Sequence, residues 1–154
     1  MTSLEQHLIF TLEGHHYTLP LSHIDRIVPA VHVTPLPKAP EVILGVINVR
    51  GQIIPVINLR KRFHLPEREV EPSDQFIVAH TARRMVALSV DAVIEVSNLS
   101  GQIVTSGRDI VPNVEYLAGI AKQEDGVLLI HDLDACLSFD EEKALDSALP
   151  DAEG

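Results

Sequence analysis

The chain has 154 residues, and its 22 acidic residues against 12 Lys and Arg residues give a formal net charge of −10 at pH 7. A charge of this sign repels nucleic acid and anionic lipid, and no apolar run approaches the roughly 18 residues needed to span a bilayer. Aromatic residues make up only 4% of the chain, which leaves no platform for stacking bases. These features favour a cytoplasmic protein without direct membrane insertion and without a nucleic-acid partner.

The first forty residues predict short strands separated by turns. Apolar and more polar residues alternate from 7 to 12, a period of two that is typical of a strand with one buried face. Gly14 begins a turn into a second strand over 17–21, and β character resumes over 27–33 after one brief helical turn. Three prolines within 34–40 exclude a sheet ladder there and predict an extended surface loop.

The segment Gly45–Phe63 predicts a β-hairpin followed by a helical turn. Runs rich in β-branched residues, 46–49 and 53–57, flank a polar break. Gly51 lies in that break and can take the positive φ that a tight connection needs. Arg50 is therefore expected at or beside the tip of the hairpin.

Asn58 follows the hairpin and can cap the helical turn. The turn carries three basic residues in succession, Arg60, Lys61 and Arg62. They could form a nucleic-acid patch, but in a strongly acidic chain such a run is typical of a solvated face. We expect all three to face water.

The remaining residues repeat this plan. The polar stretch 67–74 is expected to link two halves, and strands are predicted over 76–79, 85–90 and 93–96, followed by an irregular segment over 97–114. A second copy of the hairpin then matches the first without a gap, 74 positions later. The chain therefore contains an internal duplication.

The two copies differ at the tip of the hairpin. Residues 48–51 of the first copy, with Arg50, stand in the register of 122–125 in the second, which lack an arginine. Shared apolar positions indicate a shared fold, whereas the unshared tip indicates a function carried by one copy.

Short strands, brief helical turns and turn residues at the connections predict an all-β protein made of two small β-barrel subdomains. One subdomain is expected over about 7–66 and the other over about 74–137, within a single domain spanning 1–154. A C-terminal helix and acidic tail are expected over 138–154, because Ser138 and Glu141 have capping-box spacing. The first core is predicted to contain Leu8, Phe10, Leu19, Leu21, Ile54 and Val56, and the second Phe76, Val78, Leu88, Val90, Leu128 and Ile130.

No group of residues predicts catalysis, metal binding or a cofactor. His15 and His16 are neighbours in a turn and have no third ligand at useful spacing. His131 and Asp132 could form an acid/base pair, but Asp132 is expected to cap the following turn. Cys136 is the sole cysteine, has an acidic residue nearby and is expected to be a small buried thiol.

Arg50 points instead to recognition of another protein. An arginine at the end of a rigid hairpin offers its planar guanidinium with little entropy to lose, which suits a partner's carboxylate. The alternative is an exposed tip arginine without a role.

The first hairpin also carries a family resemblance. Its sequences GVINVRG, residues 45–51, and PVINLR, residues 55–60, resemble the CheW signature G-x-x-N-L-R-G-x-x-x-P-x-x-D-L-R. Members of this family are adaptors of bacterial chemotaxis. The resemblance implies a pair of SH3-like five-stranded barrels that form a non-catalytic scaffold in a two-component signal transduction array. It also implies two partners, the cytoplasmic tip of a chemoreceptor (methyl-accepting chemotaxis protein) and the regulatory domain of the histidine kinase CheA.

The resemblance implies a receptor-binding groove that includes Ile24, Arg26, Gly45, Asn48 and Arg50, and it assigns no kinase-binding residue. Arg26 stands where the family usually has glutamate, which reverses a charge near the groove. Such departures also fit an adaptor of a parallel, non-motility chemosensory pathway.

Two other classes of function stay open. The first is an enzyme or small-ligand sensor with its site in a cleft between the halves, where His131 and Asp132 would act. The second is a structural subunit that only associates with itself.

Overall fold

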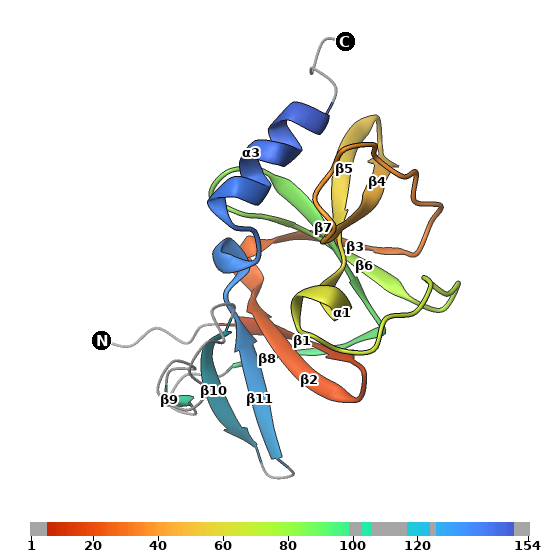
Figure 1. The fold of residues 1–154 in the computed structure, drawn as a ribbon. Coiled ribbons are helices and arrows are strands. Elements are labelled where there is room, and N and C mark those ends of the chain that lie inside the picture. The colour runs from red at the N-terminus through yellow and green to blue at the C-terminus, as the bar shows by residue number, and fades with distance from the viewer. Residues whose placement is uncertain (1–5, 99–102, 106–116, 124–125, 150–154) are drawn as a thin grey trace.

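The computed structural model describes residues 6–98, 103–105, 117–123 and 126–149. In these residues eleven strands form two sheets, with strand orders β8-β1-β2-β11-β10-β9 and β3-β6-β7-β5-β4 (Figure 1). The strands are β1 (Gln6–Leu12), β2 (His15–Pro20), β3 (Ile24–Pro29), β4 (Ile43–Val49), β5 (Gln52–Ile57), β6 (Gln75–His80), β7 (Met85–Val90), β8 (Ala92–Asn98), β9 (Ile103–Thr105), β10 (Leu117–Gln123) and β11 (Gly126–His131).

Helical segments in the described part are short, as the sequence predicts. They are η1 (Leu21–His23), α1 (Leu59–Arg62), η2 (Leu133–Ala135) and α3 (Phe139–Ala148). The mostly β fold with brief helical turns and a C-terminal helix is thus confirmed. One sheet has a sixth strand, because β9 lies within the segment 97–114 that was expected to be irregular and pairs with β10.

The two sheets exchange strands between the duplicated copies. In one sheet β2 pairs in parallel with β11, and in the other β5 pairs in parallel with β7. In one sheet the β1–β2 pair of the first copy lies beside the β10–β11 hairpin of the second. In the other sheet the β6–β7 pair of the second copy lies beside the β4–β5 hairpin of the first. The sheets do not follow the expected division into residues 7–66 and 74–137. Alternation of apolar residues identifies a buried face, but it does not say which strand lies alongside.

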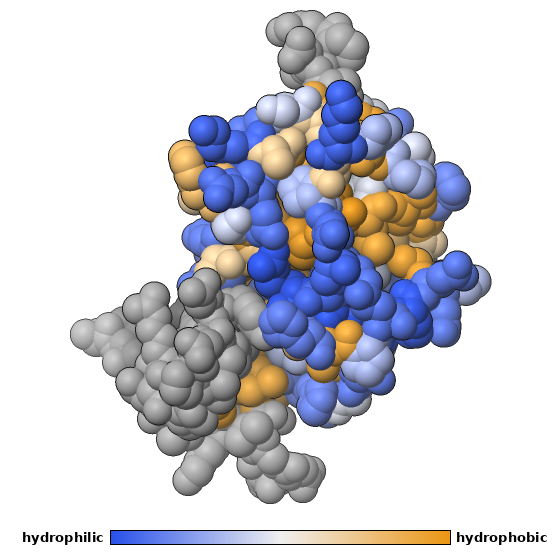
Figure 2. Space-filling model, viewed as in Figure 1, coloured by the Kyte–Doolittle hydropathy of each residue, from blue (hydrophilic) through white to orange (hydrophobic). Residues whose placement is uncertain are grey.

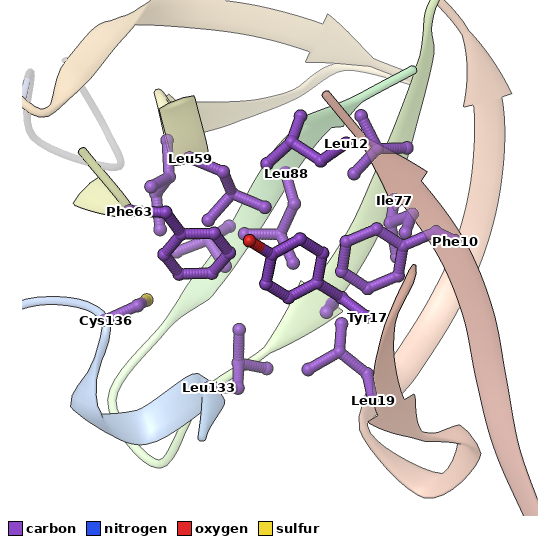
Figure 3. Close-up of a cluster of buried hydrophobic side chains, with 14 of the residues drawn as sticks. Phe10, Leu12, Tyr17, Leu19, Leu59, Phe63, Ile77, Leu88, Leu133 and Cys136 are labelled. Carbon is purple, nitrogen blue, oxygen red and sulfur yellow. The ribbon is translucent and has the colours of Figure 1, made fainter. Parts of the chain in front are cut away.

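The largest core lies between the two sheets (Figure 3). The ring of Tyr17 stacks between those of Phe10 and Phe63, with centroid distances of 5.9 Å and 4.8 Å. Leu19 from β2 and Leu88 from β7 are buried in the same cluster.

The predicted grouping of core residues was wrong, because residues of the two copies share clusters. Ile54 and Val56 belong to a separate cluster with Phe76 and Val78, inside the five-stranded sheet. Leu128 and Ile130 pack on Ile9, inside the six-stranded sheet. Nearly all of the predicted core residues are buried, Leu21 only partly, but the strand exchange decides which ones meet.

Helix α1 joins turns of the two sheets through Arg60. Asn58 caps it as predicted, since its side chain accepts a hydrogen bond from Lys61 N at 3.1 Å. Arg60 was expected to face water, but it is 7% exposed and pairs with Glu13 and Asp91. The prediction failed because a run of three charges on a helical turn points in several directions, and here Arg60 meets acids from the β1–β2 and β7–β8 turns.

This ion-pair network continues to a second arginine. Arg68 pairs with Asp91 and, through both its terminal nitrogens, with Asp74 at 2.8 Å. Burial raises the pKa of Asp74, but the hydrogen bonds from Arg68 and from the Glu71 amide outweigh it and hold the pKa below its ordinary value. The network fixes the entrance to β6 against the turn between β7 and β8.

Helix α3 docks on this framework, beside the turn that joins β6 and β7 (Figure 1). Leu145 is fully buried. Arg62 binds both carboxylate oxygens of Glu141 at 2.6 Å, and Arg84 binds Glu142 at 2.6 Å. The predicted capping box of Ser138 and Glu141 is present.

We expect Ser138→Ala to lower the free energy of unfolding by about 1 kcal/mol, because the amide of Glu141 loses its acceptor. Urea unfolding gives the loss, and amide exchange over 139–149 should show it in α3 and not in the strands. Ser147→Ala, an exposed position of the same helix, is the control and should be neutral. Equal stability of Ser138→Ala and the parent would contradict a working cap.

Candidate functional site

A groove of about 490 Å³ opens between β3 and the tip of the β4–β5 hairpin. The strands β3 and β4 are the edges of the five-stranded sheet. In the view of Figure 2, hydrophobic side chains gather on the part of the surface where β4 lies in Figure 1. The β3/β4 groove is lined by Asp25, Arg26, Ile27, Val28, Val31, Asn48, Val49 and Arg50.

The tip of the hairpin is a two-residue turn that presents Arg50. Val49 pairs with Gln52, and between them Arg50 has φ 53° and Gly51 φ 87°. Positive φ at both central residues is the mark of a type I′ turn, in which Asn-Gly is strongly preferred. The side chain of Asn48 accepts a hydrogen bond from Gly51 N at 2.7 Å and locks the turn. The predicted position of Arg50 is confirmed, and it is exposed.

Arg50 occupies its position at a cost in backbone energy. A non-glycine residue in the left-handed region costs roughly 1–2 kcal/mol, and asparagine or glycine costs less. Local strain of this kind is concentrated at functional sites. Among the described residues Arg50 has no ion pair or hydrogen bond to compensate, so the structure leaves its guanidinium free for a partner.

Gly45 is not among the residues that line the groove. It is buried at a register shift in β4, with φ 153°. A Cβ there would lie 2.2 Å from the carbonyl oxygen of Thr34. Thr34 in turn exchanges two backbone hydrogen bonds with Val46, at 2.8 and 2.9 Å. The close approach that glycine permits thus holds the segment after β3 against β4.

Gly45→Ala is therefore expected to cost about 1–3 kcal/mol of stability, since the backbone of Thr34 must move away. Chemical unfolding measures the loss. Gly14→Ala provides the comparison, because Gly14 also has positive φ but nothing lies within 4 Å of the position that a Cβ would take there. A loss in Gly45→Ala no greater than in Gly14→Ala would contradict the steric argument.

The other two expected groove residues differ from each other. Ile24 is half-buried against the main core and is not among the lining residues. Arg26 lines the groove, with 35% of its side chain exposed, and pairs with Asp25 at 2.9 Å. The structure therefore brings together Arg26, Asn48 and Arg50 in the groove, whereas Gly45 and Ile24 do not line it.

Sequence reasoning missed the apolar part of the groove. Ile27 and Val31 are 38% and 47% exposed, although both lie in a run that reads as an ordinary buried strand. The signal that could have found them is the position of the run, since it precedes a proline-rich loop that cannot cover it with a further strand. Two arginines and one aspartate also give the lining a charge of +1 in a chain of net charge −10.

His131 and Asp132, the residues of the alternative enzyme or ligand site, do not line the β3/β4 groove. His131 is 1% exposed and packs edge-on against Phe63, with ring centroids 5.2 Å apart. Complete burial lowers its pKa to about 3. Asp132 is at the predicted cap position of η2, but its side chain makes no capping hydrogen bond, so that prediction was wrong. Cys136 is buried as predicted, and burial raises its pKa to about 12.

Within the described ranges, no group of three or more His, Cys, Asp or Glu residues could hold a metal ion. The helices of the same ranges include none with the length and apolar character of a membrane span.

A model of the CheW-like domain matches residues 6–141. The chain belongs to the CheW family. It is 30% identical to the "Chemotaxis protein CheW" of Bacillus subtilis, over 96% of this chain and 94% of that protein. It is also 30% identical to the protein of that name from Treponema pallidum, over 88% and 84% of the two chains.

The fold is that of a solved CheW structure. The "scaffolding protein TtCheW from Thermoanaerobacter tengcongensis" superposes with a TM-score of 0.81 at 30% identity, covering 90% of this chain and 96% of that one. The CheW match includes every residue of the β3/β4 groove and both sheets of the described part. The two SH3-like subdomains expected of the family are thus confirmed in this chain.

Proposed function

We propose that this CheW-family chain couples the cytoplasmic tip of a chemoreceptor to the regulatory domain of the histidine kinase CheA, and that the receptor tip binds in the β3/β4 groove. The chain acts as a non-catalytic scaffold. It works on the cytoplasmic side of the inner membrane, within receptor clusters, and contacts the membrane only through its partners.

The observation that carries this proposal is Arg50 at the tip of a tight turn. The turn has an arginine at a position with positive φ, where asparagine or glycine would have a lower backbone energy. The side chain is exposed, and beside it lies an apolar floor that includes Ile27 and Val31. A planar cation next to apolar surface fits a protein segment that presents a carboxylate and apolar side chains.

The size of the groove sets the expected affinity. A surface of this extent buries far less than the roughly 1,200–2,000 Å² of a stable protein complex. The single contact is therefore expected to be weak and to become effective when many adaptors, receptors and kinases hold one another in an array.

The proposal is tested by reconstituting the complex from purified parts. A chemoreceptor tip fragment and a CheA regulatory domain are titrated into the chain separately, and then together, by calorimetry and size-exclusion chromatography. A coupling adaptor binds each partner and forms a ternary complex. Failure to bind either partner, or competition between the two for one surface, would contradict coupling.

Two inexpensive measurements address the other classes of function. A panel of metabolites and metal ions in a thermal-melting screen should leave the melting temperature unchanged, because a ligand-binding site would raise it. Size-exclusion chromatography of the chain alone at low and high concentration should show one species. The elution volume of a self-associating subunit would decrease as the concentration rises.

A further inference from the structure

Strand β3 begins with an irregularity, and the two residues at this point carry opposite charges. Ile24 pairs with Ala79 and Arg26 pairs with Val78, so Asp25 is an extra residue between them. Extra residues of this kind bend a strand and re-aim its side chains. Asp25 and Arg26 both line the β3/β4 groove, together with Ile27 and Val28 of the same strand.

The two charges form an ion pair at the surface. Arg26 Nε donates to Asp25 Oδ2 at 2.9 Å, and the two side chains are 35% and 42% exposed. An exposed pair between adjacent residues contributes little to stability. The pair therefore matters more for the groove than for the fold, because it occupies a donor of Arg26 that would otherwise face a bound partner.

The rest of the groove defines which partner could replace Asp25. Arg50 has no ion pair within the described part of the chain, and Ile27 and Val31 present apolar surface in the same groove. A segment with apolar side chains and two carboxylates would match both cations. A segment with a basic residue opposite Arg26 would be repelled.

We propose that Asp25 is an internal substitute for a partner's carboxylate, and that an acidic residue of the receptor tip displaces it from Arg26 while a second one pairs with Arg50. This inference rests on the proposed function, since it specifies the chemistry of the receptor segment that the groove accepts. Arg26 then determines specificity, and Asp25 weakens binding by competing for the same guanidinium.

The experiment is a calorimetric double-mutant cycle with a purified chemoreceptor tip fragment as the probe. Asp25→Asn removes the competitor and is expected to tighten binding about two- to fivefold, the range that corresponds to an exposed ion pair. Arg26→Gln should weaken binding about tenfold, and Arg26→Glu should weaken it further. In the Arg26→Gln background, Asp25→Asn should no longer tighten binding, because no cation is left to release.

The control is Glu95→Gln. It makes the same change of net charge at an exposed residue of β8, which corresponds to β3 in the other sheet. The affinity for the tip fragment should be that of the parent.

Each outcome separates the inference from the proposed function. If the parent binds the tip but Asp25→Asn and Arg26→Gln leave the affinity unchanged, the inference is overturned and the coupling function stands. If Asp25→Asn still tightens binding in the Arg26→Gln background, the gain comes from the change in net charge. Competition for Arg26 is then overturned as its explanation. If the parent does not bind any receptor tip, the proposed function fails and the inference fails with it.

Discussion

Replacing Arg50 by asparagine is expected to abolish useful binding of a chemoreceptor tip and at the same time to make the protein more stable. Truncating an anchor residue of an interface typically costs about 2–4 kcal/mol, or roughly 30- to 1000-fold in affinity. The same change creates Asn-Gly at a turn where both residues have positive φ, which should add about 0.5–1 kcal/mol to the free energy of unfolding. Opposite signs in the two measurements are the mark of a residue kept for binding.

Arg50→Lys tests whether binding depends on the shape of the side chain or only on its charge. It keeps the charge and the left-handed backbone but loses the planar fork, so its affinity should fall nearly as far as that of Arg50→Ala. Calorimetry with the tip fragment and urea unfolding of each variant give the two quantities.

Arg83→Ala is the matched control, because Arg83 is an exposed arginine at the turn between β6 and β7, outside the groove. It should bind the tip as the parent does. Parental affinity in Arg50→Ala, or a loss of several kcal/mol in its stability, would show that Arg50 supports the fold and does not bind the receptor.

The second large effect is expected from pH. His131 has an ordinary pKa of 6.5 and a folded-state pKa of about 3, because it is completely buried. Below pH 6.5 the unfolded chain takes up a proton that the folded chain excludes, so stability falls as the pH drops from 6.5 towards 3. The slope approaches about 1.4 kcal/mol per pH unit. Above this range the residue contributes no pH dependence.

His131→Ile should remove that slope. Ile57 occupies the matching position of the first copy and is fully buried in the same core, so the replacement copies a side chain that the fold already accommodates. Neither ring nitrogen of His131 has a hydrogen-bond partner among the residues that the structure describes, so the variant should also gain about 1–3 kcal/mol at neutral pH.

Urea unfolding at several pH values from about 7.5 down to about 4.5, a range that spans the ordinary histidine pKa, measures both effects. The window excludes most of the contribution of Asp74, whose lowered pKa makes its ion pair with Arg68 fail only at more acidic pH. His16→Gln, a change at an exposed histidine, should keep the parental slope. If the stability of the parent and of His131→Ile depends on pH in the same way, His131 is not the source of the slope.

The sequence predicted those features that depend on neighbours along the chain. The β-hairpin with Arg50 at its tip, the cap at Asn58 and the capping box of Ser138 each arise from residues within a few positions of one another, where propensity and hydrogen-bond geometry decide. The burial of nearly every predicted core residue follows from the same local alternation.

Other features could not be predicted, because they depend on pairing between distant segments. Arg60 is buried because acids from the β1–β2 and β7–β8 turns surround it. Asp25 lines the groove at a point where β3 shifts its register against β6. Ile27 and Val31 stay exposed at one edge of the five-stranded sheet, in β3 and in the segment directly after it. Each of these facts depends on which strands lie side by side, and the alternation of residues along one segment does not predict that.

The exchange of strands between the copies imposes an order on folding during synthesis. The sheet of β3 to β7 is complete once Val90 has left the ribosome, whereas the β1–β2 hairpin must wait for β11, which ends at His131. At about 5–20 residues per second, the roughly 110 intervening residues take about 6–20 s to appear. Throughout that interval Phe10 and Leu19 lack part of their core, so the nascent chain presents an unfinished apolar face to any chaperone at the tunnel exit.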